Sequence, residues 1–200
     1  MATDPTVAPA APPLPAGLPV PEDDGAADHL VGESIPSGRF ETTHGQGVDL
    51  QEMAAGRLVL FVFPRIGRPG QADPVGWDDI PGARGCTQQS CAYRDLNREF
   101  ADAGYAVAGL SAQSTNEQLE AAARLHLPFP LLADPDLKLR DALRLPFFSA
   151  GGMTLYRRLT LVAEESRIVK AFYPVFPPQD NARQVLDWIR LRILRANGRL

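Results

Sequence analysis

The sequence predicts a layered α/β domain in which helices flank a central mixed sheet. Strand-like apolar segments alternate with amphipathic helical segments between residues 57 and 143, the pattern of strands joined by helical crossovers. Two further strand-like segments then surround a polar turn before a final helix, which adds an antiparallel part to the sheet. A chain of 200 residues is long enough for one such domain and too short for two of ordinary size.

The composition excludes several classes of protein. Apolar residues make up 44% of the chain, charged residues 22%, and the formal net charge is −4, so no basic surface is expected to bind nucleic acid. No segment approaches the roughly 18 consecutive apolar residues of a membrane span. Residues 1–28 contain neither Lys nor Arg and no continuous apolar block, so no export or transit signal is expected and the predicted location is cytoplasmic.

The first 30 residues differ from the rest of the chain. They contain seven prolines and seven alanines, and an acidic cluster at residues 22–24. Such a segment buries too little apolar surface to order itself. We therefore expect a flexible tail with polyproline character over residues 1–30 and a folded domain over residues 31–200.

The domain is expected to begin with strands. Residues 40–50 predict a short hairpin with glycines in its turn. Residues 57–63 lack polar alternation after Arg57, which is typical of a strand covered on both faces, so they form the predicted central strand. Residues 64–85 form a connection rich in glycine and proline, and its length is typical of a functional lid.

Helices and strands alternate in the remainder of the domain. We expect, in order, a helix over residues 87–103, a strand over 106–110, a helix from 114 to about 126, a strand over 129–133, a short helix from 134, strands over 158–162 and 167–173, and a final helix from about 180. Ser114 and Glu117 have capping-box spacing, which marks the start of the second helix.

The chain contains two cysteines, Cys86 and Cys91. In the cytoplasm such a pair is seldom a structural disulfide, because the thiol pool keeps it reduced unless it cycles. Cys86 stands at the start of a predicted helix, where unpaired backbone N–H groups and the helix dipole favour a thiolate nucleophile. Gly85 permits close backbone approach, so a small polar or anionic oxygen can reach the same amides.

The spacing of the two cysteines predicts a redox cycle. Side chains five positions apart point about 140° away from each other on an ideal helix. Cys86 is expected near the buried face and Cys91 away from it. Because a disulfide tolerates Cα separations only up to roughly 7 Å, joining the two sulfurs requires the first turn or two of the helix to unwind. Oxidation of Cys86 to sulfenic acid, followed by attack from Cys91, fits this layout.

Other interpretations remain open on spacing alone. Two cysteines near a helix start are often small apolar core residues. No CxxC pair is present, and the histidines at positions 29, 44 and 126 are scattered along the chain. Little therefore supports a zinc site or a Cys–His hydrolase.

Residues 81–95, with the sequence PGARGCTQQSCAYRD, resemble the active-site segment of the peroxiredoxin Q, or bacterioferritin comigratory protein, family. The Gly-Cys-Thr run, the second cysteine five positions later and the aromatic-Arg-Asp ending carry the match. Residues 129–135 resemble the family's strand before its next short helix, and residues 158–162 resemble the strand bearing its active-site arginine. The similarity covers roughly residues 32–194.

This resemblance implies a thioredoxin-like fold with three layers and a thiol peroxidase activity. Cys86 is then the peroxidatic residue and Cys91 the resolving residue. Arg158 lies beside the Cys86 thiolate, where its permanently charged guanidinium favours the thiolate and holds the peroxide oxygens. As an alternative, Arg158 is only a surface charge at the end of a strand.

Three supporting residues are predicted at the same site: Pro64, Gly85 and Thr87. Pro64 shields the cysteine from water in the family, although a proline there also simply ends the strand. The chain departs from the family at Ala83, where the family has a Thr or Ser whose hydroxyl bonds the peroxide. Thr87 either substitutes for that hydroxyl or only caps the helix. An insertion between Pro64 and Cys86 either loops out or forms a new wall of the pocket.

The expected activity is reduction of hydrogen peroxide and organic hydroperoxides, with an intramolecular disulfide that thioredoxin or glutaredoxin reduces. No metal or organic cofactor is expected, and the chain is expected to be a monomer or a weak homodimer. Removal of the proline-rich tail is expected to leave activity nearly unchanged. The alternatives are a general thiol–disulfide oxidoreductase, which the absence of CxxC disfavours, and a non-catalytic sensor or binding module.

Overall fold

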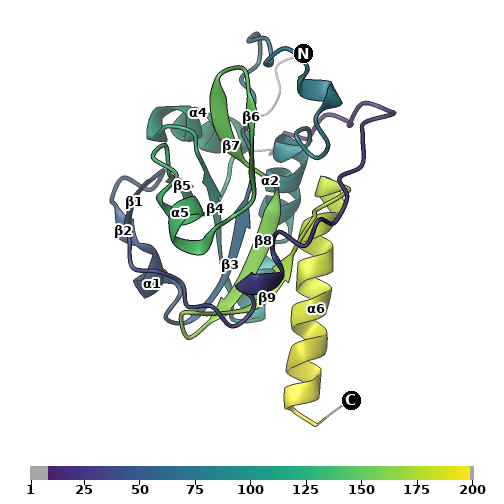
Figure 1. Cartoon of the computed structure of the whole chain (residues 1–200). Helices are drawn as coiled ribbons and strands as arrows, with labels where there is room; N and C mark the ends of the chain where they lie inside the picture. The colour runs from purple at the N-terminus through teal and green to yellow at the C-terminus, as the bar shows by residue number, and fades with distance from the viewer. Residues whose placement is uncertain (1–8, 199–200) are drawn as a thin grey trace.

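A computed structural model describes residues 9–198, and helices flank a central sheet as predicted (Figure 1). The strands are β1 (Arg39–Thr42), β2 (Val48–Asp49), β3 (Arg57–Val62), β4 (Ala106–Ser111), β5 (Leu131–Ala133), β6 (Phe147–Ala150), β7 (Met153–Tyr156), β8 (Leu159–Glu164) and β9 (Arg167–Phe172). The helices are α1 (Leu50–Met53), α2 (Cys86–Asp95), α3 (Asn97–Asp102), α4 (Thr115–Leu125), α5 (Lys138–Leu143) and α6 (Asn181–Ala196), with short 3-10 helices η1 (Asp28–Leu30), η2 (Trp77–Asp79) and η3 (Pro178–Asp180).

The main sheet combines parallel and antiparallel strands in the order β2-β1-β5-β4-β3-β8-β9. Strand β4 runs parallel to its neighbours β3 and β5. Strand β8 runs antiparallel to β3, and β9 runs antiparallel to β8. The predicted mixed sheet, with an antiparallel pair before the final helix, is therefore confirmed.

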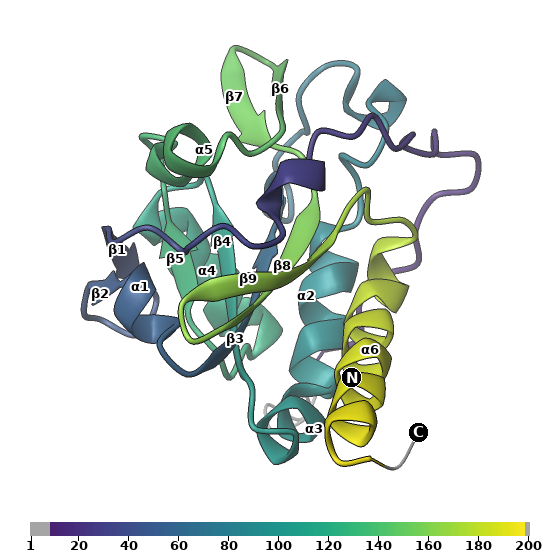
Figure 2. The ribbon, with the colours of Figure 1, turned by 60° about the horizontal axis from the view of Figure 1, so that its bottom comes forward.

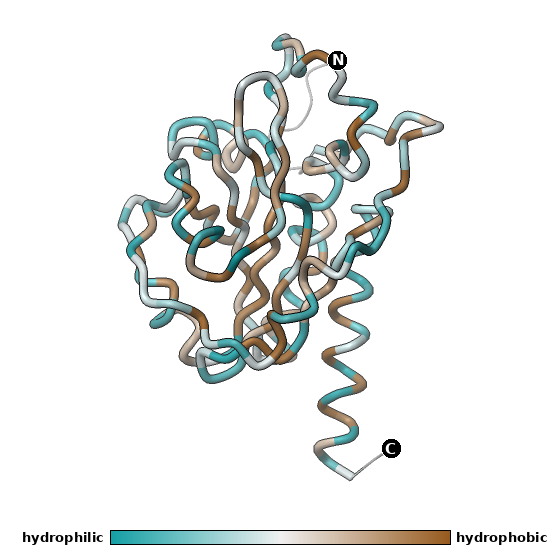
Figure 3. The backbone as a smooth tube through the Cα atoms, in the orientation of Figure 1, coloured by the Kyte–Doolittle hydropathy of each residue, from teal (hydrophilic) through white to brown (hydrophobic). Residues whose placement is uncertain are grey.

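Strand β3 separates two hydrophobic cores, because successive side chains of a strand point to opposite faces of the sheet. Leu58 and Leu60 belong to the core under α1 and α5, whereas Val59 and Phe61 belong to the core under α2, α3, α4 and α6. Hydrophobic segments accordingly run through the central strands in Figure 3. Strand β3 therefore lacks polar alternation because both of its faces are buried, as predicted.

The helix that contains both cysteines packs against the final helix, and α2 and α6 lie side by side in Figure 2. Tyr93 of α2 stacks on Phe61 of β3 with ring centroids 4.5 Å apart. A single helix over residues 87–103 is not observed, because α2 ends at Asp95 and α3 follows after a break at Leu96. The capping box of α4, between Ser114 and Glu117, is present as predicted.

The structure adds two features that the sequence did not indicate. Strands β6 and β7 form a separate hairpin outside the main sheet. These strands are short and partly exposed, so they lack the apolar run that marked the other strands. Helix α5 also starts later than expected, because the Asp134 carboxylate accepts the backbone N–H groups of Lys138 and Leu139 and so precedes the helix.

The N-terminal segment is in contact with the domain. Of the tail expected over residues 1–30, residues 1–8 lie outside the described part of the chain. Ala27 and Leu30 are buried in the core beneath α1 and α5, and η1 lies between the tail and the first strand. The boundary expected after residue 30 therefore falls within packed structure, while the flexibility of the preceding residues stays a prediction.

Candidate active site

Cys86 is the first residue of α2 and is buried, with 3% of its surface exposed. The preceding Gly85 has φ 104°, and a Cβ there would lie 2.1 Å from Cγ of Pro178. Only glycine fits this close approach of η3 to the helix start. The first-turn amides of α2 have no intrahelical acceptor, so they are available beside the Cys86 sulfur.

Arg158 brings a buried guanidinium to this sulfur. Its Nη2 lies 3.2 Å from Cys86 Sγ and also donates to the backbone carbonyls of Gly82, Ala83 and Arg84 at 3.0 to 3.2 Å. The residue is 3% exposed, so the alternative of a surface charge is wrong. No carboxylate pairs with Arg158 among the ion pairs of residues 9–198. Because a buried cation is costly without a counter-charge, a thiolate at Cys86 complements this site.

A polar network fixes the orientation of Arg158. Arg158 Nη1 donates to Gln89 Oε1 at 2.6 Å, and Gln89 Nε2 donates to Asn181 Oδ1 at 2.9 Å. Asn181 Oδ1 also accepts hydroxyl hydrogen bonds from Tyr93 at 2.7 Å and Thr160 at 2.8 Å. All of these side chains are buried, and burial raises the pKa of Tyr93, which keeps its hydroxyl a donor.

Sequence reasoning missed Gln89 and Asn181. For Gln89 a signal was present, because a residue three positions after Cys86 lies on nearly the same side of a helix. For Asn181 no local signal exists, since its partners come from α2 and β8. Asn181 reaches its partners on α2 and β8 because α6 packs against α2.

Cys91 lies on the same helix as Cys86, and both thiols are free. The expectation that Cys91 projects away from the buried face is wrong, because it is only 3% exposed and packs in the same hydrophobic cluster as Cys86. Burial raises the pKa of the Cys91 thiol, with Asp95 adding to the effect and Arg94 opposing it. Cys91 is therefore a covered, protonated thiol in this state.

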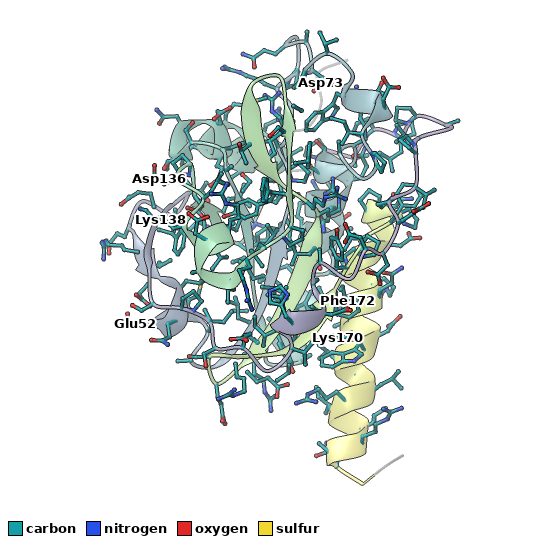
Figure 4. The ribbon with its side chains drawn as sticks, in the orientation of Figure 1. Glu52, Asp73, Asp136, Lys138, Lys170 and Phe172 are labelled. Atoms are coloured by element: carbon teal, nitrogen blue, oxygen red, sulfur yellow. The ribbon has the colours of Figure 1, made fainter. Side chains whose placement is uncertain are left out.

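A cavity of about 510 Å³ opens at Cys86, and it is far larger than the share of a water molecule in the liquid, about 30 Å³. The insertion between Pro64 and Cys86 forms one of its walls, since Arg65, Arg68 and Trp77 line it. Of the two expected arrangements for the insertion, the structure therefore has the new wall. Arg84 holds this wall in place through Asp73, at 2.5 Å, and Asp78. Asp73 lies at the end of the molecule opposite the end of α6 (Figure 4).

The remaining predicted positions differ in their relation to this cavity. Thr87 and Ala83 line it, and Ala83 is fully buried. Thr87 makes no side-chain cap hydrogen bond, because Gly85 occupies the N-cap position of α2. Pro64 is buried directly after β3 and is absent from the described residues that line the cavity.

Two other kinds of site find no support within residues 9–198. No group of three or more His, Cys, Asp or Glu side chains there could hold a metal ion. No helix in this part of the chain is long and apolar enough to cross a membrane.

Comparisons with known proteins agree with this geometry. The model of the Redoxin family matches residues 30–186. Peroxiredoxin Q, chloroplastic, of Sedum lineare is 29% identical over 160 residues, which cover 80% of this chain and 77% of that protein. Peroxiredoxin Bcp of Bacillus subtilis is 26% identical over 164 residues, 80% of this chain and 94% of that protein.

Solved structures show the same fold. Peroxidoxin BcpB from Mycobacterium tuberculosis superposes with a TM-score of 0.66 at 21% identity and covers 81% of this chain and 97% of its own. The bacterioferritin comigratory protein of Xanthomonas campestris gives a TM-score of 0.62 at 21% identity, covering 89% and 99%. The thioredoxin-like fold is thereby confirmed, and the chain belongs to the Redoxin family as a peroxiredoxin of the Q/Bcp type.

Proposed function

We propose that Cys86 is the peroxidatic residue of this thiol peroxidase. Its thiolate attacks the terminal oxygen of a hydroperoxide, the O–O bond breaks, and the leaving alkoxide or hydroxide takes up a proton to become an alcohol or water. Cys86 becomes a sulfenic acid. Arg158 Nη2 and the first-turn amides of α2 stabilise the negative charge that develops on the oxygens. The observation that carries this assignment is the 3.2 Å contact between Cys86 Sγ and a buried guanidinium that has no carboxylate partner among the described ion pairs.

Cys91 is the proposed resolving residue. It attacks the sulfenic sulfur of Cys86, and the resulting disulfide is reduced by a dithiol protein such as thioredoxin or glutaredoxin. Because the two cysteines lie five positions apart on one helix, α2 must unwind locally for this step. The cycle uses no metal or organic cofactor, and we propose that it runs in the cytoplasm with the chain as a monomer or weak homodimer.

Supporting residues act on the substrate at the cavity wall. Thr87 supplies a hydroxyl one residue after Cys86, and Gly85 allows the backbone to approach the peroxide. Pro64 is buried two residues after β3 and does not line the cavity, so its proposed part is to limit the access of water through packing rather than by contact with the peroxide. Ala83 has no hydroxyl that could bond the peroxide. Two other sets of groups therefore have to orient it: the backbone carbonyls that Arg158 holds, and the first-turn amides of α2.

The charge of the cavity suggests which hydroperoxides it prefers. Four arginines and a single aspartate line it, although the whole chain has a formal charge of −4. Arg84 and Arg124 are engaged in ion pairs, whereas Arg65 and Arg68 form none among the described residues. Glu117 and Glu120 line an adjoining cavity with these two arginines, and Glu120 is paired with Arg124. We propose that Arg65 and Arg68 favour organic hydroperoxides that carry an anionic group.

Substitution of each cysteine tests the assignment. Cys86→Ser should abolish hydroperoxide consumption, because the nucleophile is lost. Cys91→Ser should still consume one equivalent and accumulate sulfenic acid at Cys86, detected by mass spectrometry after trapping. Steady turnover of the Cys86→Ser protein with any dithiol reductant would overturn the proposal.

A further inference from the structure

The extended segment of residues 9–15, here named the strap, is attached to α2 at two points. Gln88 Nε2 donates to the Pro12 carbonyl at 2.7 Å, and Arg94 Nη1 donates to the Pro9 carbonyl at 3.0 Å. The purple N-terminal segment accordingly lies near the upper part of α2 in Figure 1. A segment rich in proline suits this role, because its carbonyls are free to accept side-chain donors.

The two attachment points flank Cys91 on the helix surface. Gln88, Cys91 and Arg94 are three residues apart, so their side-chain directions differ by about 60° at each step on an ideal helix. Cys91 therefore points between the two donors that hold the strap. Ala11, which lies between Pro9 and Pro12, packs against the hydrophobic cluster that contains Cys91. Ala11 of the strap and Cys91 thus pack in one hydrophobic cluster.

The strap also reaches the surroundings of Cys86. Its residues Pro12, Pro13 and Leu14 line the cavity. A Leu14 Cδ atom lies 3.4 Å from the position that a Cβ would take at Gly85. One short segment is therefore attached to α2 on either side of the resolving position and lines the cavity at the peroxidatic one.

We propose that the strap is a gate on the second half of the catalytic cycle: it holds α2 helical with Cys91 covered, and it must leave before Cys91 can reach Cys86. This inference rests on the proposed function, because it concerns the disulfide step. In that step the Cys91 sulfur attacks the sulfenic sulfur of Cys86, an S–S bond forms and the S–O bond breaks. Hydroxide leaves with the proton of the Cys91 thiol as water. The Cys86 sulfur is reduced and the Cys91 sulfur is oxidised, so no further reactant is needed.

The gate sets the balance between two fates of the sulfenic acid. While the strap is in place, a second hydroperoxide molecule can transfer an oxygen atom to Cys86, leaving a sulfinic acid and an alcohol or water. When the strap leaves, Cys91 captures the sulfenic acid instead. The strap therefore determines how much hydroperoxide the enzyme tolerates before it is inactivated.

Truncation measures the gate directly. The full chain, a chain lacking residues 2–16 and a control lacking only residues 2–8 are each mixed with one equivalent of hydrogen peroxide. Oxidation of Cys86 and formation of the disulfide are followed separately by rapid acid quench, thiol alkylation and mass spectrometry. We expect the disulfide step to be about twenty-five-fold faster without residues 2–16, the effect of losing two hydrogen bonds of ordinary strength, and unchanged without residues 2–8. At excess peroxide, the sulfinic fraction should fall in the shorter chain.

Failure of each idea has a distinct signature. If Cys86 of the full chain is not oxidised, the proposed function fails. If Cys86 is oxidised but all three chains form the disulfide at the same rate, the strap is no gate. Should the shorter chain fail to fold, Gln88→Ala in the full chain removes one attachment, and Gln184→Ala on the exposed face of α6 is the matched control. A faster disulfide step in Gln88→Ala alone supports the gate, and equal rates in both variants overturn it.

Discussion

Arg158 Nη2 lies 3.2 Å from Cys86 Sγ, although 72 residues separate them in the chain. The contact joins the start of α2 to the start of β8, and the guanidinium that makes it is buried among backbone carbonyls. Its Nε has no hydrogen-bond partner within the described residues. A buried donor without a partner is costly, so the arginine is held at the sulfur by the contacts of its two Nη atoms alone.

Replacement of this arginine tests its part in the chemistry. Arg158→Met keeps much of the side-chain volume and removes the charge, so we expect the second-order rate of Cys86 oxidation to fall about a hundredfold, the cost of losing a donor to the developing oxyanion. Stopped-flow measurement with hydrogen peroxide gives this rate. Arg157→Met is the control, because Arg157 is partly exposed and its described polar contacts, with Asp24 at 3.8 Å and the Phe147 carbonyl at 3.4 Å, do not include Cys86. Equal losses in both variants would contradict the assignment.

Gln89 is expected to act by positioning Arg158. Gln89→Leu removes both the acceptor for Arg158 and the donor to Asn181, so the rate of Cys86 oxidation should fall about tenfold. A purely structural role would lower only the free energy of unfolding. We therefore expect the thiolate absorbance of the protein at neutral pH to fall as well in a Cys91→Ser background. Unchanged absorbance with reduced stability would show that Gln89 only supports the fold.

A hydroxyl added at position 83 is expected to increase the peroxidase activity. Ala83→Ser adds a hydroxyl at the wall of the cavity, where the family places a hydroxyl that bonds the peroxide. We expect kcat/KM for hydrogen peroxide to rise about fivefold, the contribution of one neutral hydrogen bond. Ala83→Val, which adds volume without a donor at this fully buried position, should lower it. A rise in the Val variant would mean that volume, rather than hydrogen bonding, governs the effect.

Arg65 and Arg68 are expected to select substrates by charge. A fatty-acid hydroperoxide and its methyl ester differ only in their negative charge, and we expect the acid to be reduced with the higher kcat/KM. The double variant Arg65→Gln, Arg68→Gln should reduce that preference about fivefold, since both side chains are partly solvated. Hydrogen peroxide is the neutral reference. If the acid-to-ester ratio stays the same in the variant, these arginines do not contact the anion.

The disulfide step should depend on pH through Cys91. Burial raises the pKa of its thiol, so the proton stays bound at neutral pH and the thiolate that attacks Cys86 becomes more abundant as pH rises. We expect the rate of disulfide formation to increase about tenfold per pH unit and to keep rising beyond pH 8.5, the ordinary value for a cysteine. Single-turnover quench experiments across this range measure it. A plateau below that pH would show that Cys91 titrates as an exposed thiol.

The fold class and the class of reaction could both be predicted from the sequence. An uninterrupted apolar run at β3, a capping box at α4 and an antiparallel pair before α6 each depend on local periodicity, which is encoded by neighbouring residues. The active-site segment around Cys86 is also continuous in the chain. The resemblance to a known family also identified Arg158, because residues 158–162 form a second segment that resembles the family.

The surroundings of the two cysteines depend on contacts between distant parts of the chain. Gln89 and Asn181 form a hydrogen bond because α2 and α6 pack side by side, and the strap lies against α2 because two side chains of that helix donate to carbonyls about 80 residues earlier in the chain. Composition marked residues 1–30 as unable to bury apolar surface of their own, and within that range Pro9 and Pro12 are hydrogen-bonded to side chains of α2. Contacts of this kind produce no periodic pattern in the sequence. They depend on how distant elements pack together and not on the residues adjacent in the chain.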